Sequence, residues 1–397
     1  MTPTTEPVAV FLPSLAGGGA ERAMLNVSEA LYERGYAVDL LVASAEGQFV
    51  TQVPSGVHLI SFGVRRVSAA VPQLVRYLRR RRPAVLLTAM DHTNLVGLLA
   101  RWASRTSVRT VISVQVAFSP MFLEAQRGRG RLIRWLAQVT YPHADAVIAV
   151  SQGVANSLVQ QVRLQPDKVR IIPNPVALPN VGRLSIDPPA HPWFALGQPP
   201  VILGVGRLVP QKDFPTLIHA VARLRTERPA RLVIIGEGED RPMLVRLIEE
   251  LGLAREAELI GFQENPYPYL SRAAVLVLSS AYEGFGNVLV EAMACGTPVV
   301  SCDCPSGPSE ILDHGRYGPL VAVGDAAGLA RAIAKTLDQP PSRSMLLERA
   351  GDFAMDRVLP AYLEVLGLRA RSQTEGARRQ EAFRDATSDR REAGTQN

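Results

Sequence analysis

Two glutamates, Glu283 and Glu291, stand eight residues apart around a glycine-rich turn in the stretch EGFGNVLVEAMACGTPVV. A carboxylate only accepts hydrogen bonds, so such a pair suits the recognition of hydroxyl groups. Gly284 and Gly286 allow the turn to approach a ligand closely, and Asn287 is placed to cap the helix that follows. The N–H groups at such a helix start favour a bound anion. The helix dipole alone would explain Glu291, but neither Glu283 nor the glycines.

A second candidate segment is GRLVPQKDF, where Arg207 and Lys212 stand five residues apart in a loop after a predicted strand. Two cations in such a loop suit a diphosphate, with lysine as a point charge and arginine as a fork. Only three of the 43 basic residues are lysine, which draws attention to Lys212. The alternative is a pair of solvated surface charges.

A third candidate is SLAGGGAER, which follows the first predicted strand and opens a helix. Gly18 and Gly19 let backbone amides approach an anion at the helix start. The spacing differs from G-x-G-x-x-G, which argues against a dinucleotide site. A tight strand-to-helix turn without a ligand is the alternative.

The elements around these loops are short hydrophobic runs that alternate with helical patterns. Such near-continuous runs are typical of buried parallel strands, and their alternation with helices predicts doubly wound α/β domains. The runs before residue 175 and after residue 200 are separated by a proline-rich stretch without periodicity (174–200), which we interpret as a linker. Ligands of such sheets bind at the carboxyl ends of the strands, where the three candidate loops fall.

The length of 397 residues fits two domains. We predict an N-terminal domain over 1–178, a linker over 179–199, a second domain over 200–350, a C-terminal helix within 351–371 and a disordered tail over 372–397. The three cysteines, which cluster at 295–304, form no disulfide framework or zinc pattern and indicate a cytoplasmic protein with small buried thiols. We expect neither a signal peptide nor a transmembrane helix.

Together these segments resemble family 4 glycosyltransferases, which are retaining enzymes of the GT-B fold, over roughly residues 8–365. The resemblance implies two Rossmann-like domains facing across a cleft, with acceptor binding in the first and nucleotide-sugar binding in the second. It also implies that the C-terminal helix (about 353–368) crosses back to the first domain. It implies that Arg207 and Lys212 hold the donor diphosphate, that Glu283 contacts the transferred sugar and that Glu291 contacts the ribose. Further donor contacts are implied for Gly18, Gly19, Ile260, Gly261, Phe262, Gly284, Phe285, Gly286, Asn287 and Val288, with Glu310 nearby.

The sequence departs from the family pattern after the fifth strand of the first domain, where many relatives carry a histidine and this chain reads VISVQVAFS. The nearest substitutes are Asp91 and His92 in MDHTN, which we take as candidates for contacting the reacting sugar. Their alternative roles are a helix N-cap and a surface histidine. No Asp-x-Asp occurs, so we expect no metal and no cofactor beyond the nucleotide-sugar co-substrate.

The basic residues are concentrated in the first domain, since residues 1–180 carry a formal charge of +9 and residues 181–350 one of −3. Two arginine-rich stretches stand out: 76–82, which reads as the end of a helix, and 126–139, where Arg127, Arg129, Arg131 and Arg134 accompany Leu132 and Trp135. The second stretch suits an anionic membrane surface. For the first, a solvated helix end is the alternative. No nucleic-acid-binding module is recognised.

The predicted function is therefore a retaining, metal-independent hexosyltransferase of cell-envelope polysaccharide biosynthesis. It would move a sugar, most simply from a UDP-linked donor, to a glycan or polyprenyl-linked glycan at the inner face of the cell membrane, as a peripheral protein. Two alternatives stay open: a nucleotide-sugar epimerase on the same fold, and a non-catalytic nucleotide-sugar binding subunit.

Overall fold

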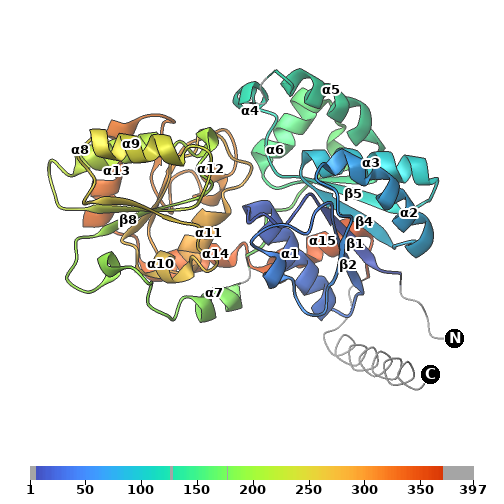
Figure 1. Cartoon of the computed structure of the whole chain (residues 1–397), viewed down its shortest axis with the longest axis horizontal. Coiled ribbons are helices and arrows are strands. Elements are labelled where there is room, and N and C mark those ends of the chain that lie inside the picture. The colour runs from blue at the N-terminus through green and yellow to red at the C-terminus, as the bar shows by residue number, and fades with distance from the viewer. Residues whose placement is uncertain (1–5, 126–127, 177, 370–397) are drawn as a thin grey trace. The chain divides into compact units, whose positions relative to one another are not determined.

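The computed structural model describes residues 6–125, 128–176 and 178–369 (Figure 1). The chain divides into two compact units, each considered as far as its residues are described. The first unit comprises Met1–Ser113, Val139–Ile148 and Val358–Asn397, and the second comprises Val114–Gln138 and Ala149–Arg357. The predicted disordered tail and Arg127 lie outside the described residues.

In the described part of the chain, seven strands form one sheet in the order β3-β2-β1-β4-β5-β6-β7. These strands are β1 Val8–Leu12, β2 Val38–Val42, β3 His58–Ser61, β4 Val85–Ala89, β5 Arg109–Val114, β6 Ala146–Ala149 and β7 Val169–Ile171. The pairs from β3 to β5 are parallel. Every residue of β1, β2 and β4 is buried, which explains why these strands are almost entirely apolar.

A second sheet has the order β10-β9-β8-β11-β12-β13, and all of its pairs are parallel. Its strands are β8 Val201–Val205, β9 Arg231–Ile235, β10 Ala257–Gly261, β11 Val275–Leu278, β12 Val299–Cys302 and β13 Leu320–Val321. In both sheets the strand order reverses once, between β1 and β4 and between β8 and β11. The two sheets confirm the predicted doubly wound α/β architecture.

The helices that cover these sheets follow the strands in alternation, as the sequence pattern predicts. They are α1 Gly19–Glu33, α2 Val71–Arg81, α3 Asp91–Ser104, α4 Pro120–Ala125, α5 Gly130–Thr140, α6 Gln152–Ser157, α7 Leu178–Leu184, α8 Phe214–Leu224, α9 Arg241–Glu250, α10 Tyr267–Arg272, α11 Asn287–Ala294, α12 Pro308–Ile311, α13 Ala326–Asp338, α14 Arg343–Gly351 and α15 Met355–Leu366. In the second unit, α8, α9 and α13 lie on one face of the sheet, and α10, α11 and α14 lie on the other (Figure 1).

The proline-rich stretch contains more structure than the sequence suggests, because α7 and a short 3-10 turn at Pro192–Phe194 lie within it. Leu184 at the end of α7 accepts a hydrogen bond from the side chain of Asn265, 2.8 Å away. Short helices flanked by prolines give no clear hydrophobic periodicity in the sequence. The helical structure of this stretch is therefore visible only in the folded unit.

Candidate active site

The strand order places the candidate loops where a ligand would be expected. Loops that follow neighbouring parallel strands on either side of a reversal turn toward opposite faces of the sheet and leave a crevice between them. In the second unit these are the loop after β8, which carries Arg207 and Lys212, and the loop after β11, which carries Glu283. The two candidate segments of the second unit, GRLVPQKDF and the segment around Glu283, therefore follow adjacent strands of the sheet.

Lys212 and Glu283 form an ion pair in the second unit. The Lys212 Nζ donates to Glu283 Oε1 at 2.5 Å, and the two side chains are only 17% and 9% exposed. Ser280 Oγ donates to the same carboxylate oxygen at 2.7 Å. The sequence predicts separate roles for these residues, and the structure places them in direct contact. A nearly buried pair of this kind is costly to break, because either partner alone would be an unpaired charge.

Backbone contacts hold the two loops together around this pair. Ser279 Oγ donates to the carbonyl of Lys212 at 2.8 Å, and the Ala281 amide donates to the carbonyl of Gln211 at 2.8 Å. The side chain of Gln211 in turn donates to the carbonyl of Tyr282 at 2.9 Å. These contacts fix the positions of Lys212 and Glu283 before any ligand arrives.

The turn between Glu283 and α11 packs tightly on the loop after β5. A Cβ atom on Gly284 would lie 1.9 Å from the carbonyl oxygen of Gln115, so only glycine fits there. Gly286 adopts a left-handed φ of 104° and is itself the N-cap residue of α11. The prediction that Asn287 caps the helix is wrong: Asn287 is the first helical residue, and its Oδ1 accepts a hydrogen bond from Asn174 at 3.1 Å.

Apart from Gly18 and Gly19, the remaining predicted donor contacts lie on the same unit. Arg207 is exposed and its charge lies near Tyr282, where it partly offsets the rise in the pKa of Tyr282 that burial causes. Glu291 lies half-buried on α11, and Phe285 and Val288 flank the start of that helix. Ile260, Gly261 and Phe262 lie at the carboxyl end of β10.

The first unit also has a glycine-rich helix start at its own strand reversal, between β1 and β4. Gly18 is the N-cap of α1 and Gly19 its first residue, as the glycine-rich segment predicts. Sequence reasoning missed Glu21, which is 5% exposed in the first turn of α1. A Cβ atom on Gly18 would lie 2.4 Å from Glu21 Oε2, so this carboxylate folds back toward the glycines at the helix start.

Asp91 and His92 begin α3, directly after β4, and lie on this first unit too. The N-cap is Met90, with a φ of 80°, so the alternative role of Asp91 as an N-cap is wrong. Asp91 Oδ1 accepts a hydrogen bond from Tyr141 Oη at 3.1 Å. Burial raises the pKa of the Asp91 carboxyl, and the Tyr141 hydrogen bond and the nearby His92 partly oppose that rise. His92 is exposed. Nothing in the sequence marks Tyr141 as the partner of Asp91.

Glu310, which the family resemblance implies near the donor, is engaged by backbone N–H groups. Its two carboxylate oxygens accept from the amides of Gln152 and Gly153, at 2.6 and 2.9 Å. Nearby, Ser151 Oγ donates to the carbonyl of Gly284 at 2.7 Å. The segment at the start of α6 is therefore bound both to the turn before α11 and to α12.

The three cysteines are free and buried, in agreement with the prediction that they are small core residues. Burial is the main cause that raises the pKa of each thiol, to about 12 for Cys295, Cys302 and Cys304 alike. A thiol with such a pKa is almost entirely protonated at neutral pH and is a poor nucleophile.

The two arginine-rich stretches differ in their surroundings. In the first, Arg79 donates to the carbonyls of Ser104 and Ala103 at the end of α3, and Arg81 pairs with the buried Asp39. Both arginines lie exposed in the last turn of α2, as the alternative of a solvated helix end expects, and they also make these contacts within the first unit. In the second stretch, Leu132 and Trp135 on α5 are 54% and 55% exposed.

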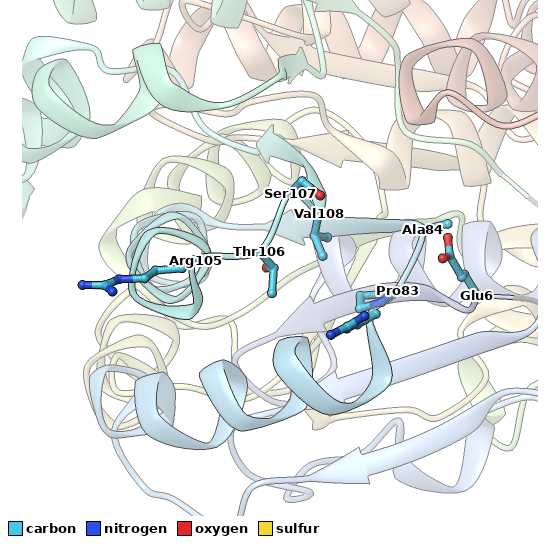
Figure 2. Close-up of a pocket in the computed structure, with 8 residues that line it drawn as sticks. Glu6, Pro83, Ala84, Arg105, Thr106, Ser107 and Val108 are labelled. Atoms are coloured by element: carbon cyan, nitrogen blue, oxygen red, sulfur yellow. The ribbon is translucent and has the colours of Figure 1, made fainter.

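A pocket of about 450 Å³ lies elsewhere, at the amino ends of β1, β4 and β5 (Figure 2). Residues from three chain segments line it: Glu6, Arg82, Pro83, Ala84, Arg105, Thr106, Ser107 and Val108. None of the predicted site residues is among them. Within the described ranges, no group of three or more histidine, cysteine or acidic side chains could hold a metal ion. No described helix combines the length and apolar character needed to cross a bilayer.

Two parallel sheets with charged and glycine-rich loops at their strand reversals define a protein of two doubly wound α/β sheets, a class in which ligands bind at such reversals. Comparison with known proteins gives the family. Residues 17–178 match the model "Glycosyltransferase Family 4", and residues 192–352 match "Glycosyl transferases group 1". The chain belongs to this glycosyltransferase family, has the GT-B fold, and is a glycosyltransferase.

Individual relatives span nearly the whole chain. The lipopolysaccharide core biosynthesis glycosyltransferase LpsE of Rhizobium meliloti is 30% identical over 362 residues, which is 88% of this chain and 96% of LpsE. The Campylobacter jejuni N-acetylgalactosamine-N,N'-diacetylbacillosaminyl-diphospho-undecaprenol 4-alpha-N-acetylgalactosaminyltransferase is 28% identical, over 87% of this chain and 94% of that enzyme. The structure of Anabaena HepE in complex with UDP and glucose superposes with a TM-score of 0.75 at 20% identity, covering 91% of this chain and 99% of HepE.

Proposed function

We propose that this glycosyltransferase is retaining and metal-independent. It moves a sugar from a UDP-linked donor to a lipid-linked or cell-envelope glycan at the cytoplasmic face of the membrane. The observation that carries the proposal is the Lys212–Glu283 pair at the strand reversal of the second unit, beside the glycine-rich start of α11. It combines a cation for a diphosphate and an acceptor for sugar hydroxyls at one point.

The donor is assigned from this chemistry and from the relatives. HepE binds UDP and glucose, and the Campylobacter enzyme acts on a diphospho-undecaprenol substrate. In this chain, Arg207 and Lys212 bind the diphosphate, Glu283 binds the transferred sugar and Glu291 binds the ribose. The positive end of the α11 dipole adds to the positive field at the diphosphate.

Catalysis then depends mainly on stabilising the leaving diphosphate. Fixed positive charge in a partly buried site does so without reorganisation at the moment of reaction, and the two loops are already held together by hydrogen bonds. The acceptor hydroxyl attacks from the face that the diphosphate leaves, and a phosphate oxygen takes up its proton. The chain supplies no covalent nucleophile in this scheme, and Asp91 or His92 contacts the reacting sugar.

The membrane assignment is based on α5. Leu132 and Trp135, one helical turn apart, are each more than half exposed, and Arg129, Arg131 and Arg134 are close to them in the sequence. Each basic residue near an anionic lipid surface contributes about 1 kcal/mol, and the apolar side chains add their burial. Leu132→Ser with Trp135→Ser should reduce sedimentation with anionic vesicles, whereas Val245→Ser, at a position 40% exposed on α9, should not.

The first experiment is thermal stabilisation of the purified protein by UDP-, GDP- and ADP-sugars, with and without EDTA. We expect one UDP-sugar to raise the melting temperature in both conditions, and Lys212→Ala to abolish the shift. Lys335→Ala is the matched control, since Lys335 is an exposed lysine on α13. A shift that requires added metal would refute metal independence, and a preference for GDP or ADP would refute the donor assignment.

Transfer itself is measured with the preferred donor and a membrane extract. The anomeric configuration of the product, followed by NMR, decides whether the enzyme is retaining. Donor consumption without any acceptor would favour the epimerase. Donor binding without turnover in the extract would favour a non-catalytic binding subunit.

A further inference from the structure

Three side-chain amides meet beside the turn that follows Glu283. Asn174 follows β7 and is only 3% exposed. Its Nδ2 donates to Gln115 Oε1 at 2.9 Å and to Asn287 Oδ1 at 3.1 Å, so both of its N–H groups are used. Its Oδ1 is buried and has no hydrogen-bond partner. Buried polar atoms without a partner are rare in folded proteins and ask for an explanation.

This amide cluster borders the proposed donor site. Asn287 is the first residue of α11 and stands four positions after Glu283. Gln115 directly follows β5, and its carbonyl oxygen packs against Gly284 so closely that no side chain would fit there. Asn174 therefore hydrogen-bonds to two residues beside this turn. Gln115 packs against the turn at Gly284, and Asn287 directly follows the turn as the first residue of α11.

The chemistry of the cluster fits a hydroxyl group. The side-chain oxygens of Gln115 and Asn287 both accept from Asn174. The NH₂ group of each of these two amides therefore points away from Asn174. Asn174 itself retains one polar atom without a partner. Turning the Asn174 amide over would exchange its oxygen and nitrogen, so that the atom without a partner would be a donor instead of an acceptor. A sugar hydroxyl can bond to a donor or to an acceptor, because it both donates and accepts.

We propose that Asn174 is a specificity-determining residue: its Oδ1 accepts a hydrogen bond from a hydroxyl group of the transferred sugar. The inference rests on the proposed function, because it assumes that the donor binds at the start of α11. Gln115 and Asn287, which accept hydrogen bonds from the Nδ2 of Asn174, are half-buried. Because the Oδ1 of Asn174 is itself buried, a sugar hydroxyl reaches it when a neighbouring side chain rotates away.

The experiment measures the dissociation constants of UDP and of the preferred UDP-sugar by calorimetry, for the wild type, Asn174→Ala and Asn174→Asp. Alanine removes the acceptor, whereas aspartate keeps an acceptor at the same position. Aspartate loses the N–H groups that donate to Gln115 and Asn287, but both of these amides can turn over and donate to the carboxylate instead. We expect Asn174→Ala to bind UDP within about twofold of wild type but the UDP-sugar about tenfold more weakly, the effect of one ordinary hydrogen bond. Asn174→Asp should still bind the UDP-sugar more tightly than UDP, by nearly the same factor as the wild type.

A structural role would give a different result. If Asn174→Ala weakens UDP and UDP-sugar binding by the same factor, or changes neither, the proposal is wrong. Loss of the sugar-dependent gain in Asn174→Asp would also refute it, even if the alanine variant does not fold. Asn265→Ala is the matched control, since the Nδ2 and the Oδ1 of Asn265 both form hydrogen bonds within the same unit. A wild-type protein that binds no nucleotide would overturn the donor assignment itself and this proposal with it.

Discussion

Breaking the Lys212–Glu283 pair should destabilise the second unit of the protein in a way that a double-mutant cycle reveals. Lys212→Met leaves Glu283 charged and 9% exposed, with Ser280 as the donor that remains. Removing one partner of a buried pair typically costs about 3–5 kcal/mol. We expect about 3 kcal/mol for Lys212→Met and less for Glu283→Gln, because the lysine chain can turn its ammonium toward water.

The double variant should cost less than the sum of the two single changes, with a coupling energy of about 2 kcal/mol. For a unit of this size, 3 kcal/mol corresponds to roughly 6–12 °C in melting temperature, which calorimetry resolves easily. Additive effects of the two substitutions, within about 0.5 kcal/mol, would refute the argument that the pair acts as a unit.

The same pair predicts a separation of binding from turnover. In the proposed binding mode Lys212 turns from Glu283 toward the diphosphate, so the carboxylate competes with the ligand for the ammonium. Glu283→Gln should therefore strengthen binding of UDP by about three- to tenfold, while transfer falls by several orders of magnitude because the sugar contact is lost. Weaker binding of UDP to Glu283→Gln would contradict this competition, whatever happens to activity.

Other substitutions test the remaining parts of the site. Gly284→Ala should weaken binding of the donor by more than about tenfold, because a Cβ would meet the carbonyl of Gln115 at 1.9 Å, whereas Gly351→Ala, with nothing within 4 Å, should not; calorimetric titration compares the two. Burial makes the folded state hold the proton of Asp91 more tightly than the unfolded chain, which costs stability above the folded pKa. Tyr141→Phe removes a hydrogen bond that opposes this rise in pKa, so its loss of melting temperature should be larger at about pH 8 than at about pH 4, and an equal loss would contradict this role. The buried cysteines should not react with a thiol reagent until the protein unfolds, and rapid reaction of the native protein would show that the second unit opens.

Much of the fold is predictable from the sequence because buried parallel strands must be apolar throughout. β1 coincides with the run VAVFL, and α1 begins within one residue of the helix predicted after the glycines. The candidate loops are predictable for a related reason, since glycine, lysine and glutamate at the end of a buried strand have few structural explanations. α7 escapes prediction because its short length, its proline and its glycine hide any period.

The partners of the site residues are less accessible to sequence reasoning, because they are distant along the chain. Tyr141 lies 50 residues from Asp91, and Asn174 lies 113 residues from Asn287. A tyrosine in TYPHADAV or an asparagine in a proline-rich stretch has no local pattern that marks it. The wrong assignment of Asn287 as a cap has the same origin: a nearby cap is a sound local choice, but a contact with Asn174 takes the side chain instead.

The arrangement of charges in the second unit suggests why the site is stable without its ligand. A lysine poised for a diphosphate would be an unpaired, nearly buried cation in the free enzyme, and a carboxylate poised for hydroxyl groups would be an unpaired anion. The strand order places the two loops side by side, so each charge satisfies the other until a donor arrives. In the proposed binding mode, the donor offers a phosphate to the lysine and hydroxyl groups to the glutamate at once. A nucleotide without its sugar offers only the first, so Glu283 loses its cation without gaining hydroxyl groups. We therefore expect the complete donor to bind more tightly than the nucleotide alone.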